Sequence, residues 1–249
     1  YDIFIVKYGP SGNILWAKSA GHAGNDLGIS ITKDNSNNIY ITGYYYSASI
    51  TFGATSLLNV DSAGIYPDIF IVKYDASGNV IWAKSEGSSS GDFGESITTD
   101  AFGNVYVIGD YYSSSIIFGA TTLTNASWSS YTDVFVVKYN DSGNVIWAKG
   151  FGSTTSEALN GITTDASGNV YITGSYTSPS ISLGATTLSN SGSYGYDMFI
   201  AKLDATAVGI EENIFTQGIY IYPNPSNGMF TLKSTDLKLQ NCSIYNVLG

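Results

Sequence analysis

Cysteine and histidine are almost missing from this 249-residue chain, which contains only Cys242 and His22. A single cysteine cannot form an internal disulfide, so packing must stabilise the fold. Zinc sites built from several Cys or His ligands are excluded by count. Catalysis of the Ser–His–Asp or Cys–His type would need His22 to meet a nucleophile, and nothing in the sequence marks such a partner. Because Ser88 and Ser153 stand in its place in the other repeats, we interpret His22 as an incidental loop residue.

Charged residues are also scarce, at 12% of the chain, and Lys and Arg number 10 against 20 Asp and Glu. The net charge of −10 and the pI near 4.3 disfavour binding to nucleic acid and to anionic membrane surfaces. No apolar run approaches the ~20 residues that span a bilayer. Hydrophobic residues nevertheless make up 43% of the chain, which is enough for a core. The 28 Gly and 20 Tyr against 5 Pro are typical of many short strands joined by tight turns.

What the chain does have is a repeat. The segments DIFIVKYGPSGNILWAK, DIFIVKYDASGNVIWAK and DVFVVKYNDSGNVIWAK start at Asp2, Asp68 and Asp133, and DMFIAKLD starts at Asp197. The offsets are 66 (68 − 2), 65 (133 − 68) and 64 (197 − 133). Copies this regular must fold alike and bury their apolar faces on their neighbours. A residue present in every copy therefore serves the fold of the repeat first.

The second copy predicts strands over 68–74, 80–84, 96–100 and 105–109, with tight turns at 75–79 and 101–104 and a short rim hairpin over 115–125. Both faces of the first of these strands are apolar, so its sheet should be covered on both sides. Tandem antiparallel sheets of about four strands with two buried faces are typical of β-propeller blades. A β-sandwich would show one polar face per strand, and a parallel β-helix would have a much shorter coil. The in-phase Trp16, Trp82 and Trp147 are predicted to lie in the core of the blades.

The phased pattern D-x-F-x-x-K-Y…S-G-N-x-x-W-A-K…I-T-x-D…G-N-V-Y-x-x-G resembles the bacterial SBBP β-propeller repeats over about residues 1–204. The resemblance implies an all-β propeller, often of about seven blades, on secreted or surface proteins, without shared catalytic residues. Counting strands predicts half a blade, two whole blades and three strands of another. Since a ring needs about four to eight blades, we expect a piece of a longer propeller that starts at a cut edge and exposes two blade faces. Closure with other copies of the chain is the alternative.

Beyond the repeats, residues 205–217 are predicted to be a linker and 218–249 a small separate β segment. Its strands IYIY and MFTLK flank a Pro-Asn-Pro-Ser-Asn-Gly turn, and CSIYNVL is predicted as a third strand. YPNPSNGMFTL (222–232) and SIYNVLG (243–249) resemble the type A C-terminal sorting domain of the type IX secretion system, here in an incomplete form. That resemblance implies a sorting motif at Tyr222, Pro223, Asn224, Pro225 and Gly228, secretion machinery as a partner, and export to the cell surface or medium.

Two sets of acidic residues recur in phase. Asp34, Asp100 and Asp165 open the turns D-x-x-G/N-N, where a carboxylate accepts backbone N–H bonds; the spacing of an EF-hand-type calcium loop is absent. Asp26, Asp92 and Glu157 precede the inner strand of each blade. There they either cap loops or form an acidic ring that binds a cation. Calcium is therefore the one cofactor considered, and these three are the candidate metal ligands.

Tyrosines cluster after the strand of each V-Y-x-x-G segment: Tyr44, Tyr45, Tyr46, Tyr111 and Tyr112. Exposed Tyr can stack on sugar rings or form a protein interface. The alternative is that these rings pack beneath the rim hairpin. If they bind a ligand, a surface polysaccharide is the first hypothesis, because the resemblances imply a location at the cell surface.

These observations predict a secreted or surface-displayed propeller that acts as a binding or adhesion scaffold for a protein or polysaccharide. One alternative is a spacer that separates another domain from the sorting signal. The other is a polysaccharide-acting enzyme, which would need two carboxylates about 5–10 Å apart in one pocket. No catalytic constellation is visible in the sequence, and specific function is expected in the residues that differ between copies.

Overall fold

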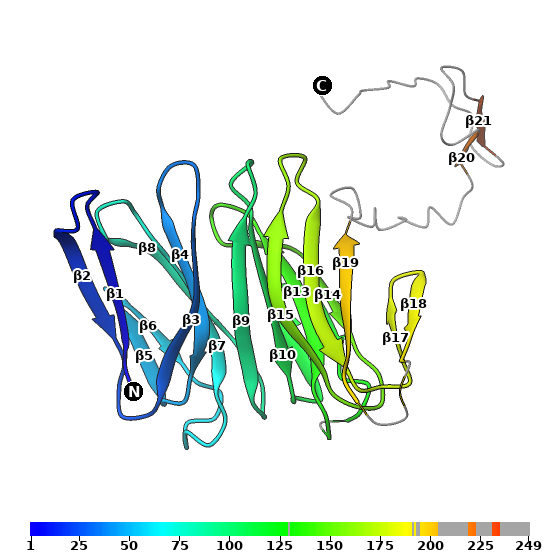
Figure 1. The fold of residues 1–249 in the computed structure, drawn as a ribbon, viewed down its shortest axis with the longest axis horizontal. Helices are drawn as coiled ribbons and strands as arrows, with labels where there is room; N and C mark the ends of the chain where they lie inside the picture. The colour runs from blue at the N-terminus through cyan, green and yellow to red at the C-terminus, as the bar shows by residue number, and fades with distance from the viewer. Residues whose placement is uncertain (129, 191, 193–194, 204–218, 223–230, 235–249) are drawn as a thin grey trace. The chain divides into compact units, whose positions relative to one another are not determined.

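The structure is a computed structural model that describes residues 1–128, 130–190, 192, 195–203, 219–222 and 231–234. The chain divides into two compact units, Tyr1–Ala205 and Thr206–Gly249. All regular elements in the described residues are β-strands (Figure 1). That part of the chain contains no helix of the length and apolarity that a membrane crossing requires.

The first unit is a series of antiparallel sheets that repeat in chain order. A half-blade contains β1 (Ile3–Tyr8) and β2 (Ile14–Ala20). The first blade contains β3 (Asp26–Lys33), β4 (Ile39–Tyr45), β7 (Asp68–Tyr74) and β8 (Val80–Glu86). The second blade contains β9 (Asp92–Thr99), β10 (Val105–Tyr111), β13 (Asp133–Tyr139) and β14 (Val145–Phe151). The third blade contains β15 (Glu157–Thr164), β16 (Val170–Tyr176) and β19 (Asp197–Leu203). The predicted fold class, including the order of half, whole and three-stranded blades, is confirmed.

Each blade also carries a rim hairpin, as predicted for 115–125. The hairpins are β5 (Ser49–Phe52) with β6 (Thr55–Leu58), β11 (Ser115–Phe118) with β12 (Thr121–Thr124), and β17 (Ser180–Leu183) with β18 (Thr186–Ser189). Each is a separate two-stranded sheet, inserted between the second and third strands of its blade. The hairpins pack apolar residues against the blade core, so they add buried area without widening the sheet.

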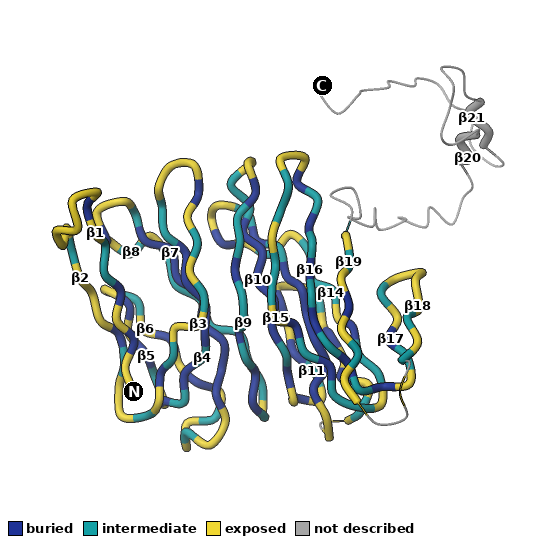
Figure 2. Tube along the Cα trace, in the orientation of Figure 1, coloured by how far each residue is buried: buried dark blue, intermediate teal, exposed yellow. Residues whose placement is uncertain are grey.

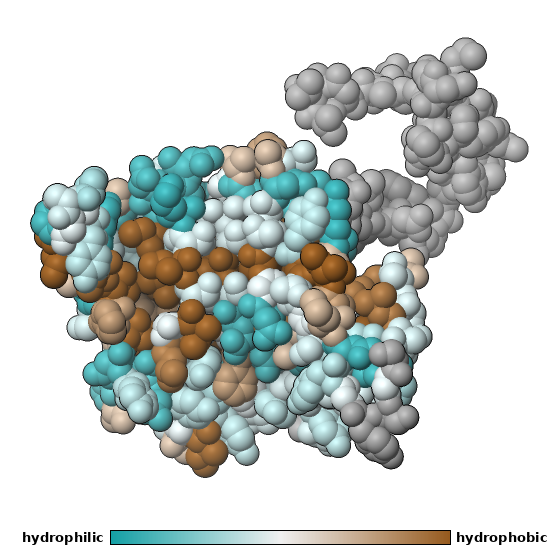
Figure 3. All heavy atoms as spheres, in the orientation of Figure 1, coloured by the Kyte–Doolittle hydropathy of each residue, from teal (hydrophilic) through white to brown (hydrophobic). Residues whose placement is uncertain are grey.

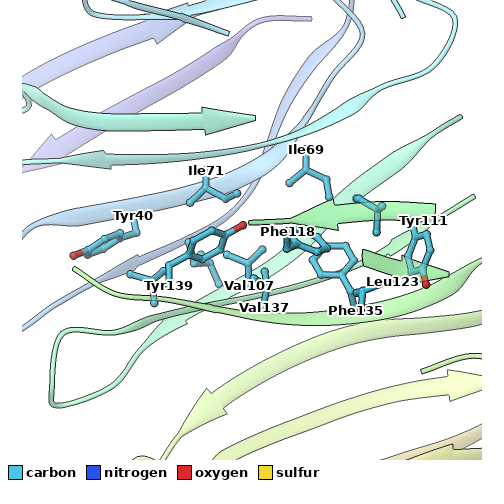
Figure 4. Close-up of a cluster of buried hydrophobic side chains, with 13 residues drawn as sticks. Tyr40, Ile69, Ile71, Val107, Tyr111, Phe118, Leu123, Phe135, Val137 and Tyr139 are labelled. Atoms are coloured by element: carbon cyan, nitrogen blue, oxygen red, sulfur yellow. The ribbon is translucent and has the colours of Figure 1, made fainter. Parts of the chain in front are cut away.

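Hydrophobic clusters lie between successive blades (Figure 4). Tyr40, Ile69 and Ile71 of the first blade meet Val107 and Val137 of the second in one such cluster. All seven residues of β7 are buried, so both faces of this strand are covered, as predicted (Figure 2). At the two ends of the series, Phe4 and Met198 are each 79% exposed although the residues in phase with them are buried.

The inner strands β3, β9 and β15 lie side by side. The hydroxyl of Thr99 donates to the carbonyl of Lys33 at 2.9 Å, and the hydroxyl of Thr164 donates to the carbonyl of Thr99 at 2.9 Å. These bonds join the inner strands of neighbouring blades directly and fix how far one strand is shifted along the next. Apolar atoms form a band across this face, and polar atoms cover both ends (Figure 3).

A lysine and a tryptophan of the half-blade donate hydrogen bonds to the first blade, and the same pair of the first blade donates to the second; we call this pair the Lys–Trp clamp. The ammonium of Lys73 and the indole N–H of Trp82 both donate to the main-chain carbonyl of Asp141, at 3.2 and 3.0 Å. Lys7 and Trp16 donate in the same way to the carbonyl of Ala76. The in-phase tryptophans are half-buried and pack against the hydrophobic clusters between the blades, so they lie at the edge of the core in which they were predicted.

The second unit is described only at β20 (Ile219–Tyr222) and β21 (Thr231–Ser234), which pair antiparallel. These strands correspond to IYIY and to most of MFTLK. The predicted linker 205–217, the strand at 242–248, and Pro223, Asn224, Pro225 and Gly228 of the sorting motif lie outside the described residues.

Candidate functional site

The turn aspartates Asp34, Asp100 and Asp165 serve the fold, because their carboxylates accept the hydrogen bonds of their own turns. Oδ1 of Asp34 accepts the backbone N–H groups of Ser36 and Asn38, and Oδ2 accepts the side-chain amide of Asn38 and the hydroxyl of Tyr40. Asp100 and Asp165 make the same set of bonds in their own turns. Burial alone would raise the pKa of Asp34, but the bonds from Asn38, Tyr40 and Ser36 outweigh it and the pKa is lowered. These carboxylates act as turn acceptors.

The three candidate metal ligands lie in different blades, at the start of β3, β9 and β15, and each is almost fully buried. Asp26 accepts bonds from the backbone of His22 and the hydroxyl of Ser47. Asp92 and Glu157 are held in the same way by Ser113 and Ser178 and by the backbone four residues earlier. Burial is the main cause that raises the pKa of both Asp92 and Glu157 to about 7. Among the described residues, no three Asp, Glu, His or Cys side chains gather where they could share a metal ion.

The five candidate tyrosines separate into two groups. Tyr45 and Tyr111 are 0% and 1% exposed and pack beneath the rim hairpins, which is the alternative considered from the sequence. Tyr44, Tyr46 and Tyr112 remain at the surface or half-buried. Because alternate residues of a strand point to opposite faces, Tyr45 had to be separated from Tyr44 and Tyr46. The candidate ligand site therefore retains only the second group.

Phe93 joins the remaining tyrosines into one array across the junction of the first and second blades. Ring centroids are 6.2 Å apart for Tyr44–Tyr46, 4.9 Å for Tyr44–Phe93 and 6.4 Å for Phe93–Tyr112, all with T-shaped geometry. We call these four residues the aromatic junction cluster. Phe93 was not predicted as a site residue. The sequence could have drawn attention to it, because the corresponding residues of the first and third blades are Leu27 and Ala158, so that the aromatic ring is specific to the second blade.

Two carboxylates accompany the aromatic junction cluster. Glu95 lies at a β-bulge in β9, and Asp110 is on the neighbouring strand β10. Burial, followed by the charge of Glu95, raises the pKa of Asp110 to about 7. Both carboxylates also act on Tyr44, whose hydroxyl pKa is raised mainly by burial. A comparison of the copies could have identified these two acids, because the corresponding positions of the first blade carry Ile29 in place of Glu95 and Tyr44 in place of Asp110.

A concave site lies at the opposite end of β4, where three turns meet. This pocket of about 400 Å³ is lined by Asp34, Asn35, Ser36, Asn38, Ala101, Phe102, Gly103 and Asp141. We call it the turn pocket. The hydroxyl of Tyr40 lies 3.1 Å from Oδ2 of Asp34 and 3.2 Å from Oδ1 of Asp141, so these two oxygens are at most 6.3 Å apart (3.1 + 3.2).

Two carboxylates from different blades thus share one pocket, which is the arrangement that the enzyme alternative requires. Glycoside hydrolysis, however, needs one carboxylic acid that keeps its proton near neutral pH. The pKa of Asp34 is lowered, and both of its oxygens already accept two hydrogen bonds. Asp34 is therefore unsuited to donate a proton, and the geometry favours binding over general acid catalysis.

The comparison with protein families agrees with this architecture. The family model described as the SBBP β-propeller repeat matches residues 82–110, which run from β8 into β10 and so cross from the first blade into the second. The chain is a β-propeller repeat protein. The matched segment includes the clamp residue Trp82 and the turn aspartate Asp100, which are parts of the repeat that the fold uses.

Two curated proteins are similar to this propeller over longer stretches. A WD repeat-containing protein, L264 of Acanthamoeba polyphaga mimivirus, is 29% identical over 253 residues, covering 85% of this chain and 18% of its own length. The regulatory protein FlaEY of Caulobacter vibrioides is 23% identical over 166 residues, covering 67% of this chain and 17% of its own. This chain therefore spans less than a fifth of either relative.

Among solved structures, a protein of unknown function from Bacteroides caccae aligns with a TM-score of 0.28 and 10% identity, covering 82% of this chain and 73% of that protein.

Proposed function

We propose that this propeller is a binding scaffold, displayed outside the cell, that holds a protein partner at the aromatic junction cluster. The observation that carries the proposal is the contrast between repeated and variable residues. Repeated side chains serve the turns and the Lys–Trp clamp, whereas Phe93, Glu95 and Asp110 differ from their in-phase residues and gather at one junction.

The ring geometry favours a protein over a polysaccharide at this cluster. Sugar rings stack on open aromatic faces, but here each ring turns its face or edge to a neighbouring ring. Of the four rings only Tyr112 is exposed by more than a third, at 40%. Partly buried aromatic groups beside carboxylates are typical of interface hot spots, and the net charge of −10 favours a basic partner.

The binding test uses substitutions that the third blade already carries. Ala158 and Thr177 stand in phase with Phe93 and Tyr112, so F93A and Y112T should leave the blade folded. Surface proteins of the source cells are cross-linked to the immobilised chain and identified by mass spectrometry. We expect one or a few basic proteins to be retained by the wild type and lost with F93A/Y112T, at an unchanged melting temperature. Equal retention by both chains would contradict the proposal, and retention of glycans alone would favour the polysaccharide alternative.

We also propose export by the type IX secretion system, on the basis of the sequence resemblance at 222–232 and 243–249. The native protein is followed in source cells with and without that machinery. The proposal expects it at the surface or in the medium of normal cells and inside the envelope of deficient ones. The same location in both strains would contradict export by this route and would leave the binding proposal intact.

A further inference from the structure

The turn pocket carries an inference that is independent of the aromatic junction cluster. Asp34, Asn35, Ser36 and Asn38 come from the turn before β4, whereas Tyr44 and Tyr46 lie at the other end of that strand. The two sites therefore face opposite ends of the blades. The pocket combines residues of the first and second blades and exists only because these blades stack.

Asp141 presents one carboxylate oxygen in a fixed position. Its Oδ1 is held by the ammonium of Lys73 and the hydroxyl of Tyr40, while the side chain as a whole is 65% exposed. No donor among the described residues reaches Oδ2. The carboxylate is thus oriented before any ligand arrives, which reduces the entropy lost on binding. Ala76 stands in phase with Asp141, so the fold of the turn does not require this carboxylate.

Phe102 supplies an open aromatic surface on the same pocket. The ring is 72% exposed and lines the cavity beside the amide side chains of Asn35 and Asn38. A single exposed ring is common on protein surfaces. This one stands where the other turns carry Ser36 and Ser167, and it accompanies the other copy-specific residue, Asp141. Two departures from the repeat therefore meet in one cavity.

The chemistry of the lining selects the class of ligand. An anion would meet two carboxylates, and the ammonium of Lys73 is only 2% exposed and already bound. A calcium ion needs about six to eight oxygen ligands, whereas both oxygens of Asp34 are already saturated by hydrogen bonds. The lining favours a neutral ligand with several hydroxyl donors and one apolar face over an organic cation, because Lys73 already pairs with Asp141, Asp34 is saturated, and amides, a hydroxyl and an aromatic ring make up most of the rest. A volume of about 400 Å³ is in the usual range for small-molecule sites.

We propose that the turn pocket binds a sugar residue of a neutral glycan. Hydroxyl groups of the sugar donate to Oδ2 of Asp141 and bond with Asn35 and Asn38, and the C–H face of the ring lies on Phe102. The bond to an ionised carboxylate is the strongest of these contacts, and the aromatic ring selects for a sugar with a continuous apolar face.

The test uses the full chain and neutral trisaccharides of glucose, mannose, galactose or xylose, titrated by ligand-observed NMR and calorimetry. We expect at least one to bind with a Kd on the order of 1 mM. D141A and F102S should each weaken that binding about tenfold or more. Both variants install the residue of a sister turn: Ala76 keeps the main-chain carbonyl that receives a clamp, and Ser167 occupies the turn of the third blade. F102S should therefore melt near the wild type. D141A also removes the carboxylate that pairs with the buried ammonium of Lys73 and should melt lower, so its affinity is measured at a temperature at which circular dichroism shows it folded.

Two matched controls make the result specific. S167A changes the in-phase residue of the third blade and should leave the affinity unchanged. Y112T changes the aromatic junction cluster and should also leave it unchanged, so failure of one proposal is distinguishable from failure of the other. The inference is overturned if none of the trisaccharides binds below about 10 mM. It is equally overturned if D141A and F102S bind the sugar as tightly as the wild type, or if a lysine-rich peptide, rather than a sugar, is what loses affinity in both variants.

Discussion

Each tryptophan of the Lys–Trp clamp packs against a glycine of the next blade: Trp16 against Gly78 and Trp82 against Gly143. Gly143 has φ of 77°, and a Cβ there would lie 3.1 Å from Cδ2 and Cε2 of the Trp82 indole. Gly103 has φ of 83° and would place a Cβ in open space, with no atom within 4 Å. Both glycines close the same kind of turn by donating to the carbonyl three residues earlier. G143A and G103A therefore share the backbone cost and differ in what the new methyl group meets. At position 143 it meets the rigid indole and also Cε of Lys84 at 2.7 Å, but that end of the lysine is flexible and can move aside.

The expected magnitudes follow from that difference. Placing an L-residue in the left-handed region costs about 1–2 kcal/mol, which both variants incur. Pressing a methyl group into a tightly packed ring adds about 1–3 kcal/mol for G143A alone. The rigid indole can move only by stretching its 3.0 Å bond to the carbonyl of Asp141. For a domain of this size about 1 kcal/mol shifts the melting temperature by roughly 2–4 °C. G143A should thus melt several degrees below G103A.

Thermal unfolding followed by circular dichroism measures the difference, and tryptophan fluorescence reports whether the indole has moved. A second pair repeats the experiment at the preceding junction, since Gly78 lies against Trp16 and Gly12 lies in open space. Equal losses within both pairs would refute the argument, because the indole would then not rest on the glycine. A larger loss in G103A would refute it as well.

Three further predictions concern the stability of the blades. W82A should lower the melting temperature by several degrees, because about 2–3 kcal/mol of packing by the half-buried indole is lost. W128A changes a ring that is 86% exposed and should leave the melting temperature unchanged. Similar melting curves for the two variants would show that Trp82 does not stabilise the interface between blades. D100A should destabilise the chain by about 1–3 kcal/mol more than D75A, because Asp100 is buried and also accepts the hydroxyl of Tyr106, while Asp75 is only half-buried. Chemical denaturation distinguishes the two variants, and equal midpoints would count against the buried bond. Burial raises the pKa of Asp92 to about 7, so ionisation of this carboxyl destabilises the folded chain; the effect is absent below about pH 4 and grows as the pH rises to about 7. The melting temperature of the wild type should therefore fall from about pH 5 to 7.5, and that of D92N should fall less steeply. An equal slope in the two chains would contradict this cause.

The strands, turns and blade count could be predicted because they depend on local patterns that recur. The apolar residues on both faces of Asp68–Tyr74 indicated a strand buried on both sides, and every one of its residues is buried. The turn role of Asp34, Asp100 and Asp165 was also visible, since the acceptor and the donor groups are within four residues.

The sites could not be predicted in the same way because their residues meet only when blades stack. Asp34 and Asp141 are 107 positions apart (141 − 34) and belong to different blades. Lys73 reaches the turn of the next blade, 68 residues away, and the sequence alone gave no reason to expect a buried lysine there. Tyr45 was grouped with its neighbours by composition, although strand alternation separates it from them. Comparing copies position by position would have drawn attention to Phe102 and Asp141.

The acceptor in the Lys–Trp clamp is a main-chain carbonyl, at Ala76 in one junction and Asp141 in the next. Every residue type offers that carbonyl, and the junction at Ala76 forms without a polar side chain at this position, whereas at Asp141 the carboxylate additionally pairs with Lys73 and Tyr40. Substitutions can therefore alter the surface at a junction while the main-chain bond of the clamp is kept. Duplication of a repeat supplies a further junction in which such substitutions can occur. The same property makes position 76 a suitable point at which to graft recognition residues into a designed array.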